Sequence, residues 1–322
     1  MTLDKLIMNL DELFSTKNEE KIMSVLQVLL NYVNKYGFMT HDRKIALFDL
    51  AEITGIHLMP LHFYNPIPQK NKLKHKDFSP YKAVGIQLNA SKQFSLLSSF
   101  QLYFDELADI PYEKPQLEHQ YYYGNPAFCG IDANIYYAFI RKFQPAKIIE
   151  VGAGFSTMMA AQAMRINQTG TLTAIEPHPF ETLKKGFDGL HQCIEKNVQD
   201  VDLSLFESLE KNDILFIDDS HVSKIGSDVN HLLLRILPIL KSGVIVHVHD
   251  IFIPYEYPEE WIRNLNLFWN EQYVFQAFLT HNTQFEVLLA NYFLSQTDFL
   301  KLKELLPNSP HHIGCSFWIK KI

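Results

Sequence analysis

The residues with the clearest chemical potential stand at the ends of short apolar runs. The first run leads through Glu150 into the glycine turn Gly152-Ala153-Gly154, which opens a segment of helical character. Glycines let a backbone approach a ligand closely, and the free N–H groups of a helix N-terminus attract an anion. Glu176 ends the second run, where its carboxylate can accept hydrogen bonds from both hydroxyls of a ribose. Together the turn and the acid predict a site for an adenosine-containing cofactor.

Two details of the turn bear on the choice of cofactor. A dinucleotide-binding fingerprint requires a third small residue that packs the helix against the strand, and Thr157 stands at that place. Glu150 precedes the first glycine by two residues, where it can organise the turn and face the ammonium group of a methionine. We therefore favour S-adenosylmethionine over a nicotinamide dinucleotide, with a purely structural glycine turn as the third interpretation.

The glycine turn also carries a family resemblance. Its sequence, EVGAGFST, fits the pattern E-x-G-x-G-x-S/T and resembles motif I of class I S-adenosylmethionine-dependent methyltransferases. In chain order, Gln199 resembles the position that contacts adenine, although it can equally belong to a polar loop, and Asp218 in ILFIDDSH resembles motif IV. The resemblance implies that the cofactor is bound by Glu150, Gly152, Ala153, Gly154, Ser156, Thr157, Glu176, Gln199 and Asp218.

The resemblance extends well beyond the turn. Residues 122–287, with motifs such as GNPAF, IDDSHV and VHVHDIFIPYEYP, resemble a bacterial branch of methyltransferase-domain proteins whose acceptors are generally unassigned. A more distant resemblance, to metal-dependent O-methyltransferases of the catechol type, places Asp218, His249 and Asp250 at the three metal-ligand positions. A divalent ion there would lower the pKa of an acceptor hydroxyl, and an imidazole ligand would favour Mn²⁺, Fe²⁺ or Zn²⁺ over Mg²⁺. The two aspartates can also hydrogen-bond backbone and acceptor groups without an ion.

His221 follows Asp218 by three residues, at the position where the catechol-type enzymes carry their lysine base. An imidazole with an ordinary pKa near 6.5 can accept a hydroxyl proton at neutral pH, so His221 is the predicted base, with Asp218 and Asp219 as the other catalytic candidates. Alternatively His221 is a hydrogen-bonding anchor and Asp219 caps the helix expected over residues 226–237. His247 and His249 share one strand face, so one of them can be a core histidine.

A scaffold must bring these strand ends together. From about residue 128 short apolar runs alternate with helical stretches, which predicts a Rossmann-like, doubly wound, mainly parallel sheet. The predicted strands cover residues 147–151, 171–175, 213–217 and 243–248. Two later runs, 285–290 and 315–319, flank an expected helix over 296–306 and predict an antiparallel edge.

The part before the sheet has a different pattern. Apolar residues three or four apart predict amphipathic helices over 3–36 and 45–53, and four prolines predict an extended segment over 57–82. A further helix is expected over 91–107. We place the boundary between a mostly helical N-terminal cap, residues 1–115, and the methyltransferase domain, residues 116–322.

Composition excludes several function classes. A net charge of -7 argues against a nucleic-acid partner, which would require a cationic surface. The three cysteines, Cys129, Cys193 and Cys315, form no CxxC, so they predict neither a disulfide framework nor a zinc knuckle. No apolar run approaches the roughly 18 residues of a membrane span, and the N-terminal segment lacks the apolar core of a signal peptide. We therefore expect a cytoplasmic protein.

The combined prediction is an S-adenosylmethionine-dependent methyltransferase that O-methylates a small molecule or a sugar-containing metabolite, with a divalent metal as an optional partner. Two alternatives stay open at this point: an NAD(P)-binding oxidoreductase that uses the same turn, and a non-catalytic cofactor-binding module whose N-terminal helices recruit a partner. The sequence does not identify the acceptor or the oligomeric state.

Overall fold

The computed structural model of the chain describes residues 19–37 and 40–322. The chain divides into two compact units, with the boundary between Leu73 and Lys74. In the described part of the first unit, α2 covers Glu19–Tyr32, the π-helix η1 covers Val33–Gly37 and α3 covers His41–Ile53. The side chain of Thr40 caps α3 by accepting a hydrogen bond from the Arg43 N–H. The predicted start of the first helix, at residue 3, lies outside the described residues.

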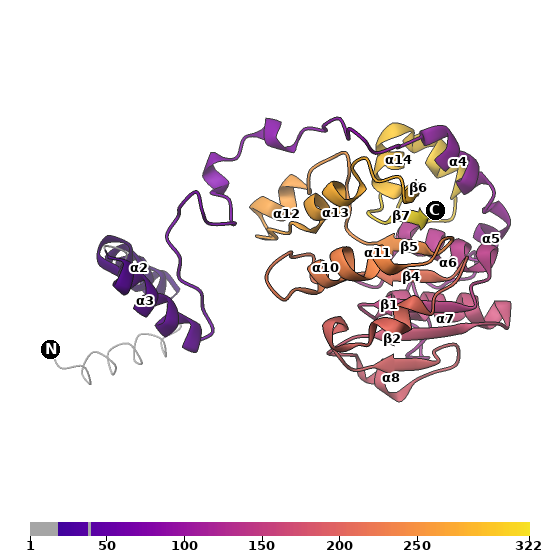
Figure 1. Cartoon of the computed structure of the whole chain (residues 1–322), viewed down its shortest axis with the longest axis horizontal. Coiled ribbons are helices and arrows are strands. Elements are labelled where there is room, and N and C mark those ends of the chain that lie inside the picture. Colours follow the sequence, from indigo (N-terminus) through magenta and orange to yellow (C-terminus); the bar gives the residue numbers. More distant parts are fainter. Residues whose placement is uncertain (1–18, 38–39) are drawn as a thin grey trace. The chain divides into compact units, whose positions relative to one another are not determined.

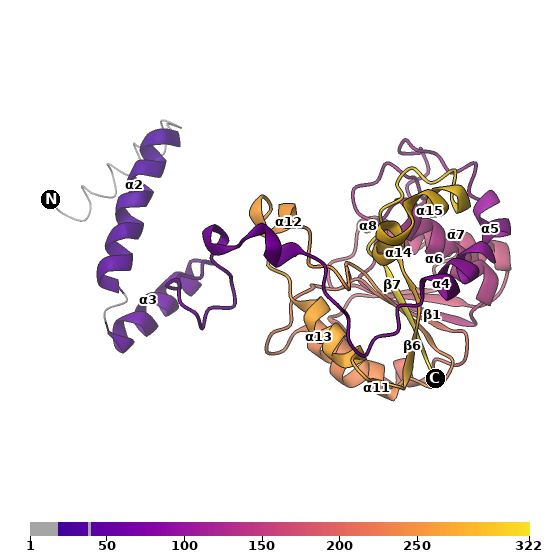
Figure 2. The same ribbon diagram turned by 90° about the horizontal axis from the view of Figure 1, so that it is seen from above.

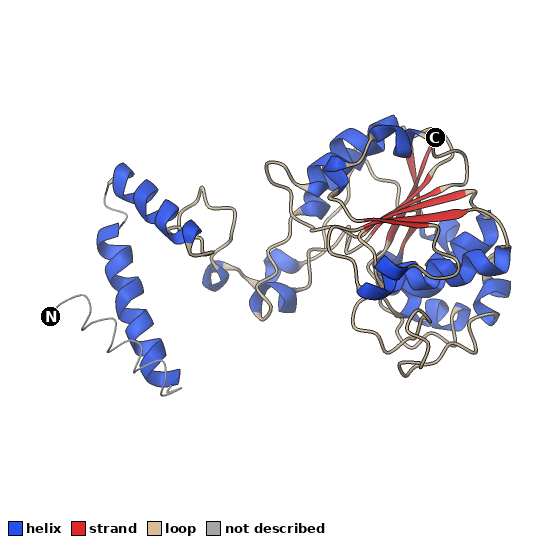
Figure 3. Ribbon diagram, turned by 90° about the horizontal axis from the view of Figure 1, so that it is seen from below, coloured by secondary structure: helices blue, strands red, loops and turns tan. Residues whose placement is uncertain are grey.

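A seven-stranded sheet, drawn as red arrows in Figure 3, forms the centre of the second unit. Its strand order is β3-β2-β1-β4-β5-β7-β6. Strands β1 to β5 are parallel to one another, and β7 is antiparallel to both β5 and β6. The strands are β1 (Lys147–Val151), β2 (Thr171–Ile175), β3 (Gln192–Ile194), β4 (Ile214–Ile217), β5 (Ile245–Val248), β6 (Phe285–Ala290) and β7 (Phe317–Lys321). The predicted Rossmann-like fold with an antiparallel edge is confirmed.

Helices cover both faces of this sheet, as Figures 1 and 2 show. One face carries α4 (Ala90–Ser98), α5 (Gln101–Asp105), α6 (Gly130–Phe143), α7 (Phe155–Asn167), α14 (Asn291–Thr297) and α15 (Phe299–Leu305). The other carries α10 (Asp228–His231), the π-helix η5 (Leu232–Ile236), α11 (Leu237–Ile239) and α13 (Glu271–Leu279). The remaining short helices are η2 (Lys70–Lys72), η3 (His75–Phe78), α8 (Glu181–Lys185), η4 (Val198–Asp200), α9 (Leu203–Glu207) and α12 (Glu259–Arg263).

Each central strand is buried on both faces, which explains its continuous apolar sequence. In β1, Ile148 packs into the core beneath α6 and α7, whereas its neighbour Ile149 packs into the core beneath α10 and α13. Successive side chains of a strand point to opposite faces, so one apolar run contributes to both cores. Among the described residues, no helix is both long and apolar enough to cross a membrane.

Several predicted elements differ from the structure. The helix expected over 91–107 is divided into α4 and α5. The one expected over 296–306 corresponds to α15, but its first two residues belong to α14, which begins at Asn291, and Asp298 separates the two helices. The second division has a clear cause, because the Asp298 side chain accepts a hydrogen bond from the Lys301 N–H and so starts a new helix. Strand β3 did not stand out in the sequence because it is only three residues long and not fully buried.

The strand register places the chemically interesting residues at one edge of the sheet. The last residue of β1, Val151, pairs with Ile175 of β2 and with Ile217 of β4, and Ile217 pairs with Val248 of β5. The residues that follow these four strands therefore emerge side by side. Functional groups gather at this carboxyl edge in open α/β sheets.

Candidate active site

The glycine turn after β1 lies directly against the end of β4. Gly152 has a φ of +81°, and a Cβ atom at this position would overlap the carbonyl oxygen of Asp218. Only glycine combines this left-handed conformation with such a close approach. The turn continues into α7, where the Gly154 N–H donates a hydrogen bond to Thr157 Oγ1 at 3.0 Å. The sequence therefore folds here into a tight bend, and the Gly152 N–H donates a hydrogen bond to the Ile175 carbonyl at the end of β2.

Glu176 follows β2 and is held beside this turn by backbone amides. Its Oε2 accepts a hydrogen bond from the Ala153 N–H at 3.3 Å, and its Oε1 accepts one from the His178 N–H at 2.9 Å. The carboxylate is partly exposed and retains free acceptor positions. The predicted pairing of glycine turn and acid is thus present in one crevice.

Two cavities meet at this crevice. The strand-end cavity, of about 380 Å³, is lined by residues that follow β1, β2 and β4, together with Gln199 and Asp228. The turn cavity, of about 170 Å³, is lined by residues 152–156 and by Phe128 and Phe180. Both cavities share the three residues Gly152, Glu176 and Asp218. Gln199 is oriented by a hydrogen bond from its Nε2 to the Gly226 carbonyl at 2.8 Å.

Glu150 lies beneath the turn and is completely buried. Tyr136 donates a hydrogen bond to its Oε1 at 2.9 Å, whereas Oε2 has no hydrogen-bond partner in the described part of the chain. Burial raises the pKa of Glu150 to about 7, even though the hydroxyls of Thr157 and Tyr136 favour its charged form. This carboxyl is therefore poised to ionise near neutral pH and has an unused acceptor.

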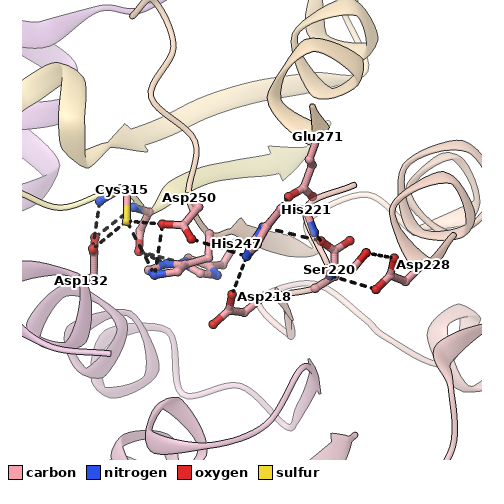
Figure 4. Close-up of polar contacts among 12 residues, drawn as sticks. Asp132, Asp218, Ser220, His221, Asp228, His247, Asp250, Glu271 and Cys315 are labelled. Atoms are coloured by element: carbon pink, nitrogen blue, oxygen red, sulfur yellow. Dashed lines mark hydrogen bonds and ion pairs between the residues drawn. The ribbon is translucent and has the colours of Figure 1, made fainter. Parts of the chain in front are cut away.

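A second group of ionisable residues surrounds His221, as Figure 4 shows. The His221 Nε2 lies 3.4 Å from Asp218 Oδ1 and 3.5 Å from Asp250 Oδ2, and its Nδ1 lies 2.9 Å from Glu271 Oε2. Burial alone would lower the pKa of His221, but Asp218 and Glu271 outweigh burial and raise it well above its ordinary value. The surrounding carboxylates therefore favour the charged form of His221.

Backbone conformation marks the same place. His221 and Asp250 both have positive φ angles, 57° and 55°, although neither is a glycine. Such conformations cost energy and persist where the surrounding structure enforces them, often at functional sites. The His221 carbonyl accepts hydrogen bonds from the backbone N–H groups of Asn270 and Glu271, which holds the loop in place.

The two neighbouring aspartates after β4 have different environments. Asp218 is about one-third exposed at its side chain, at the wall shared by both cavities. Burial raises its pKa, but His249 and His221 outweigh burial and hold the pKa below its ordinary value. The Asp219 side chain is fully buried, and this burial raises its pKa well above the ordinary value. It accepts a hydrogen bond from the His221 N–H, which opposes the shift without cancelling it. The cap of α10 is Ser227, not Asp219.

The imidazoles of β5 and of the loop after it have separate surroundings. His247 is a core histidine, because it is fully buried, stacks on Phe216 at 3.9 Å and lies 2.8 Å from Ser316 Oγ. His249 lies 3.9 Å from Asp250 and 3.7 Å from the Cys315 sulfur. Among the described residues, metal-ligating atoms converge in the groups Asp218–His221–Asp250, Asp219–His221–Glu271 and Asp132–His249–Cys315.

The structure thus places each predicted site residue at the carboxyl edge of the sheet. Gly152, Ala153, Gly154, Ser156, Glu176, Gln199 and Asp218 line the two cavities. Glu150 and Thr157 are completely buried and line neither of them. Asp218 and Asp250 face His221, and His249 faces Cys315 as well as Asp250. The cofactor, catalytic and metal roles of these residues stay predictions.

Two residues of the site did not stand out in the sequence. Glu271 begins α13, fifty residues after its partner His221, and Cys315 belongs to the loop before β7. No local spacing connects such distant residues, so only the fold reveals them. The aromatic residues near the site have two kinds of surroundings. Phe128 lines the turn cavity. Buried core positions with hydrogen-bonded hydroxyls are occupied by Tyr121, Tyr123 and Tyr257.

Comparison with known proteins agrees with this geometry. Residues 149–251, which include the glycine turn and the loops after β4 and β5, match a family model described as a methyltransferase domain. A relative from Archaeoglobus fulgidus, described as an uncharacterized protein, is 36% identical over 165 residues, which cover 48% of this chain and 74% of the relative.

Solved structures show weaker similarity. The O-methyltransferase TomG from Streptomyces achromogenes, in complex with S-adenosylmethionine, is 14% identical, with 70% of this chain and 89% of that chain covered and a TM-score of 0.36. An O-methyltransferase from Bacillus cereus, in complex with S-adenosylhomocysteine, is 11% identical, with 70% and 91% covered and a TM-score of 0.35. Scores this low do not define a fold, so the fold assignment rests on the strand order of this chain.

Proposed function

Because the chain belongs to the methyltransferase-domain family, an S-adenosylmethionine-dependent class of enzymes, we propose that it methylates an oxygen atom of a small molecule or of a sugar-containing metabolite. The observation that carries this proposal is the junction of the two cavities at Gly152, Glu176 and Asp218. A ligand that fills both cavities would pass between a glycine turn and an acid, and would end beside an ionised aspartate.

The residues present fit the cofactor. In this proposal the hydroxyls of its ribose are held by Glu176, whose carboxylate has free acceptor positions, and its carboxylate by the amides where α7 begins. The buried Oε2 of Glu150, which lacks a partner in the described residues, provides an acceptor for its ammonium group. When bound, S-adenosylmethionine supplies a methyl group on a positively charged sulfonium, which an oxygen lone pair can attack.

Asp218 is the residue we place next to the acceptor. Its carboxylate is ionised, partly exposed and part of both cavity walls. It accepts a hydrogen bond from the acceptor hydroxyl and so directs an oxygen lone pair toward the cofactor side of the crevice. Positioning of this kind supplies much of the rate when two reactants are held in attack geometry.

His221 and Asp219 act behind Asp218 in this proposal. The imidazole of His221 lies between Asp218, Asp250 and Glu271 and fixes the direction of the Asp218 carboxylate. Asp219 holds the left-handed His221 backbone through its hydrogen bond to the His221 N–H. The predicted role of His221 as base requires loss of its proton first, and it stays a prediction.

A divalent metal stays an optional part of the proposal. Asp218 and Asp250 provide two carboxylates on either side of one imidazole nitrogen, and His249 lies 3.9 Å from Asp250. These donors fit Mn²⁺, Fe²⁺ or Zn²⁺, which accept nitrogen ligands. Such an ion would lower the pKa of an acceptor hydroxyl. Methyl transfer that is unchanged after exhaustive chelation would remove the metal from the mechanism.

The test is transfer of a labelled methyl group from S-adenosylmethionine to a panel of acceptors. The panel holds catechols, phenols and sugars, with matched amines in which nitrogen replaces the acceptor oxygen. We expect label on hydroxyl compounds only, and at least about a 10-fold loss of kcat in Asp218→Asn, which keeps the size of the side chain and removes its charge.

The control is cofactor affinity, which Asp218→Asn should change far less than kcat, since its charge faces the acceptor. Label on amines alone would replace O-methylation by N-methylation. Cofactor binding without transfer to any acceptor would favour the non-catalytic module, and full kcat in Asp218→Asn would refute the role of Asp218.

A further inference from the structure

Three metal-ligating side chains converge beside the active site, and only one of them, His249, is also a donor of the optional metal in the proposed function. They are Asp132 at the start of α6, His249 after β5 and Cys315 in the loop before β7, and their ligand atoms all lie within 4.8 Å of one another. All three residues are buried or largely buried. Figure 4 shows Asp132, Asp250 and Cys315 together on the side of His221 away from Glu271.

The cysteine sulfur lies at the centre of this cluster. Cys315 Sγ is 2.9 Å from Asp250 Oδ1, 3.6 Å from Asp132 Oδ2 and 3.7 Å from His249 Nε2. His249 Nε2 is in turn 3.9 Å from Asp250 Oδ1. One sulfur, one nitrogen and one carboxylate oxygen thus converge, with Asp250 beside the sulfur.

The separations of the sulfur from Asp132 and from His249 are those of a tetrahedral metal site. Zinc bonds of about 2.3 Å to sulfur and about 2.0 Å to nitrogen and oxygen place neighbouring ligand atoms about 3.3 to 3.6 Å apart. The observed distances of 3.6 Å and 3.7 Å agree with this range to about a tenth of an ångström. A mixture of thiolate, imidazole and carboxylate selects zinc or ferrous iron over magnesium and calcium.

From this geometry we propose that Asp132, His249 and Cys315 bind one Zn²⁺-class ion. The proposal does not depend on the methyltransferase function or on the cofactor, and it shares only His249 with the optional metal of the proposed function. The three protein ligands leave the fourth position of a tetrahedral shell to water. The ion binds the thiolate of Cys315, so the thiol proton is released on binding.

The surroundings of Asp132 and Asp250 indicate what the ion would do. Asp132 already accepts hydrogen bonds from the N–H groups of Cys315 and Ser316 and from the Asn291 side chain, which orients its carboxylate toward the sulfur. Asp250 directs Oδ1 to Cys315 and Oδ2 to His221. The ion would therefore tie the loop before β7 to α6 and to the end of β5, next to Asp250 and the His221 side of the active site.

His249 is a predicted metal ligand, but nothing in the sequence connects it with Asp132 or Cys315, because the three ligands come from distant segments. Zinc sites are recognised in sequences by pairs of ligands two to four residues apart, and here no two ligands are close in the chain. The expectation that the cysteines form no zinc knuckle concerned such local spacing and does not bear on a site assembled by the fold.

The test is a titration of the full chain, stripped of metal and kept reduced, with Co²⁺ as an optical substitute for zinc and without S-adenosylmethionine. We expect one Co²⁺ per chain, a thiolate-to-cobalt charge-transfer band and the intense visible bands of tetrahedral cobalt. Cys315→Ser should lose the charge-transfer band and bind Zn²⁺ at least about 100-fold more weakly. Cys193→Ser, which alters a thiol on β3, is the matched control and should leave both unchanged.

Two further variants separate this site from its neighbours. Asp218→Asn changes the Asp218–His221–Asp250 group and should keep the charge-transfer band, whereas His249→Gln should weaken Zn²⁺ binding by a factor similar to Cys315→Ser. If Cys315→Ser does not fold, the charge-transfer band of the wild-type chain and the Zn²⁺ affinity of His249→Gln still test the proposal. Absence of a thiolate band in the wild-type chain, or its persistence in folded Cys315→Ser, would overturn the proposal.

Discussion

Replacement of Glu150 by glutamine should stabilise the protein at alkaline pH while it weakens cofactor binding. Glu150 is completely buried, its Oε1 accepts a hydrogen bond from Tyr136, and burial raises its pKa to about 7. Glutamine has the same size, can accept the same hydrogen bond and stays neutral at every pH. The variant therefore isolates the cost of a buried charge.

The magnitude follows from the pKa. The gap between the ordinary value of 4.5 and about 7 corresponds to about 3 kcal/mol, since each tenfold change in proton affinity is worth about 1.4 kcal/mol. The folded state has the higher pKa, so the contribution of Glu150 to stability is fully present below about pH 4.5 and is lost as the pH rises to about 7. Above that, Glu150→Gln should unfold with a free energy about 3 kcal/mol higher than the wild type.

The assay is urea denaturation of both proteins, followed by tryptophan fluorescence, at several pH values between 4.5 and 8.5. The difference in the free energy of unfolding should be small at the acid end and should grow with pH until it levels off. Tyr136→Phe removes the hydroxyl that donates a hydrogen bond to the Glu150 carboxylate. In this background the ionised Glu150 should lower the free energy of unfolding at high pH by more than it does in the wild type. A difference between Glu150→Gln and wild type that does not change with pH, or one that reverses, would refute the reasoning.

Three further variants test the crevice and its frame. Gly152→Ala should destabilise the fold by about 3 kcal/mol and abolish cofactor binding, because a Cβ overlaps the Asp218 carbonyl at a positive φ; thermal unfolding and calorimetry check this, and an intact affinity would contradict it. Glu176→Ala should reduce affinity for S-adenosylmethionine by about 10- to 100-fold with little change in stability, and equal affinities would exclude the ribose contact. Asp213→Ala removes buried acceptors for the N–H groups of Lys147 and Glu210, so it should cost about 2 kcal/mol of stability and leave cofactor affinity unchanged; a loss of affinity without loss of stability would be unexpected.

The sequence predicted the sheet well because its signals are local. The first two strands have the predicted bounds, since a buried run between turn residues is legible from a few neighbouring positions. The family and the fold class are confirmed for the same reason: the glycine turn, Glu176 and Asp218 each follow a strand that the pattern identifies.

The environment of the site could not be predicted in the same way. The raised pKa of His221 depends on Asp218 and on Glu271, which α13 brings from fifty residues away. The surroundings of His249 depend on Cys315 in the last loop. The burial that raises the pKa of Glu150 comes from the packing of α6 and α7 on β1, which no short motif encodes. The sequence therefore predicted which residues follow each strand. Their pKa shifts and their side-chain contacts depend on residues that only the fold brings together.

The most direct test of the central claim is calorimetric titration of the full chain with S-adenosylmethionine, S-adenosylhomocysteine and NADH side by side. We expect one molecule of either adenosyl compound to bind per chain, no binding of NADH, and the loss of affinity described above for Glu176→Ala. Binding of NADH in place of S-adenosylmethionine, or failure of both adenosyl compounds to bind, would contradict the account.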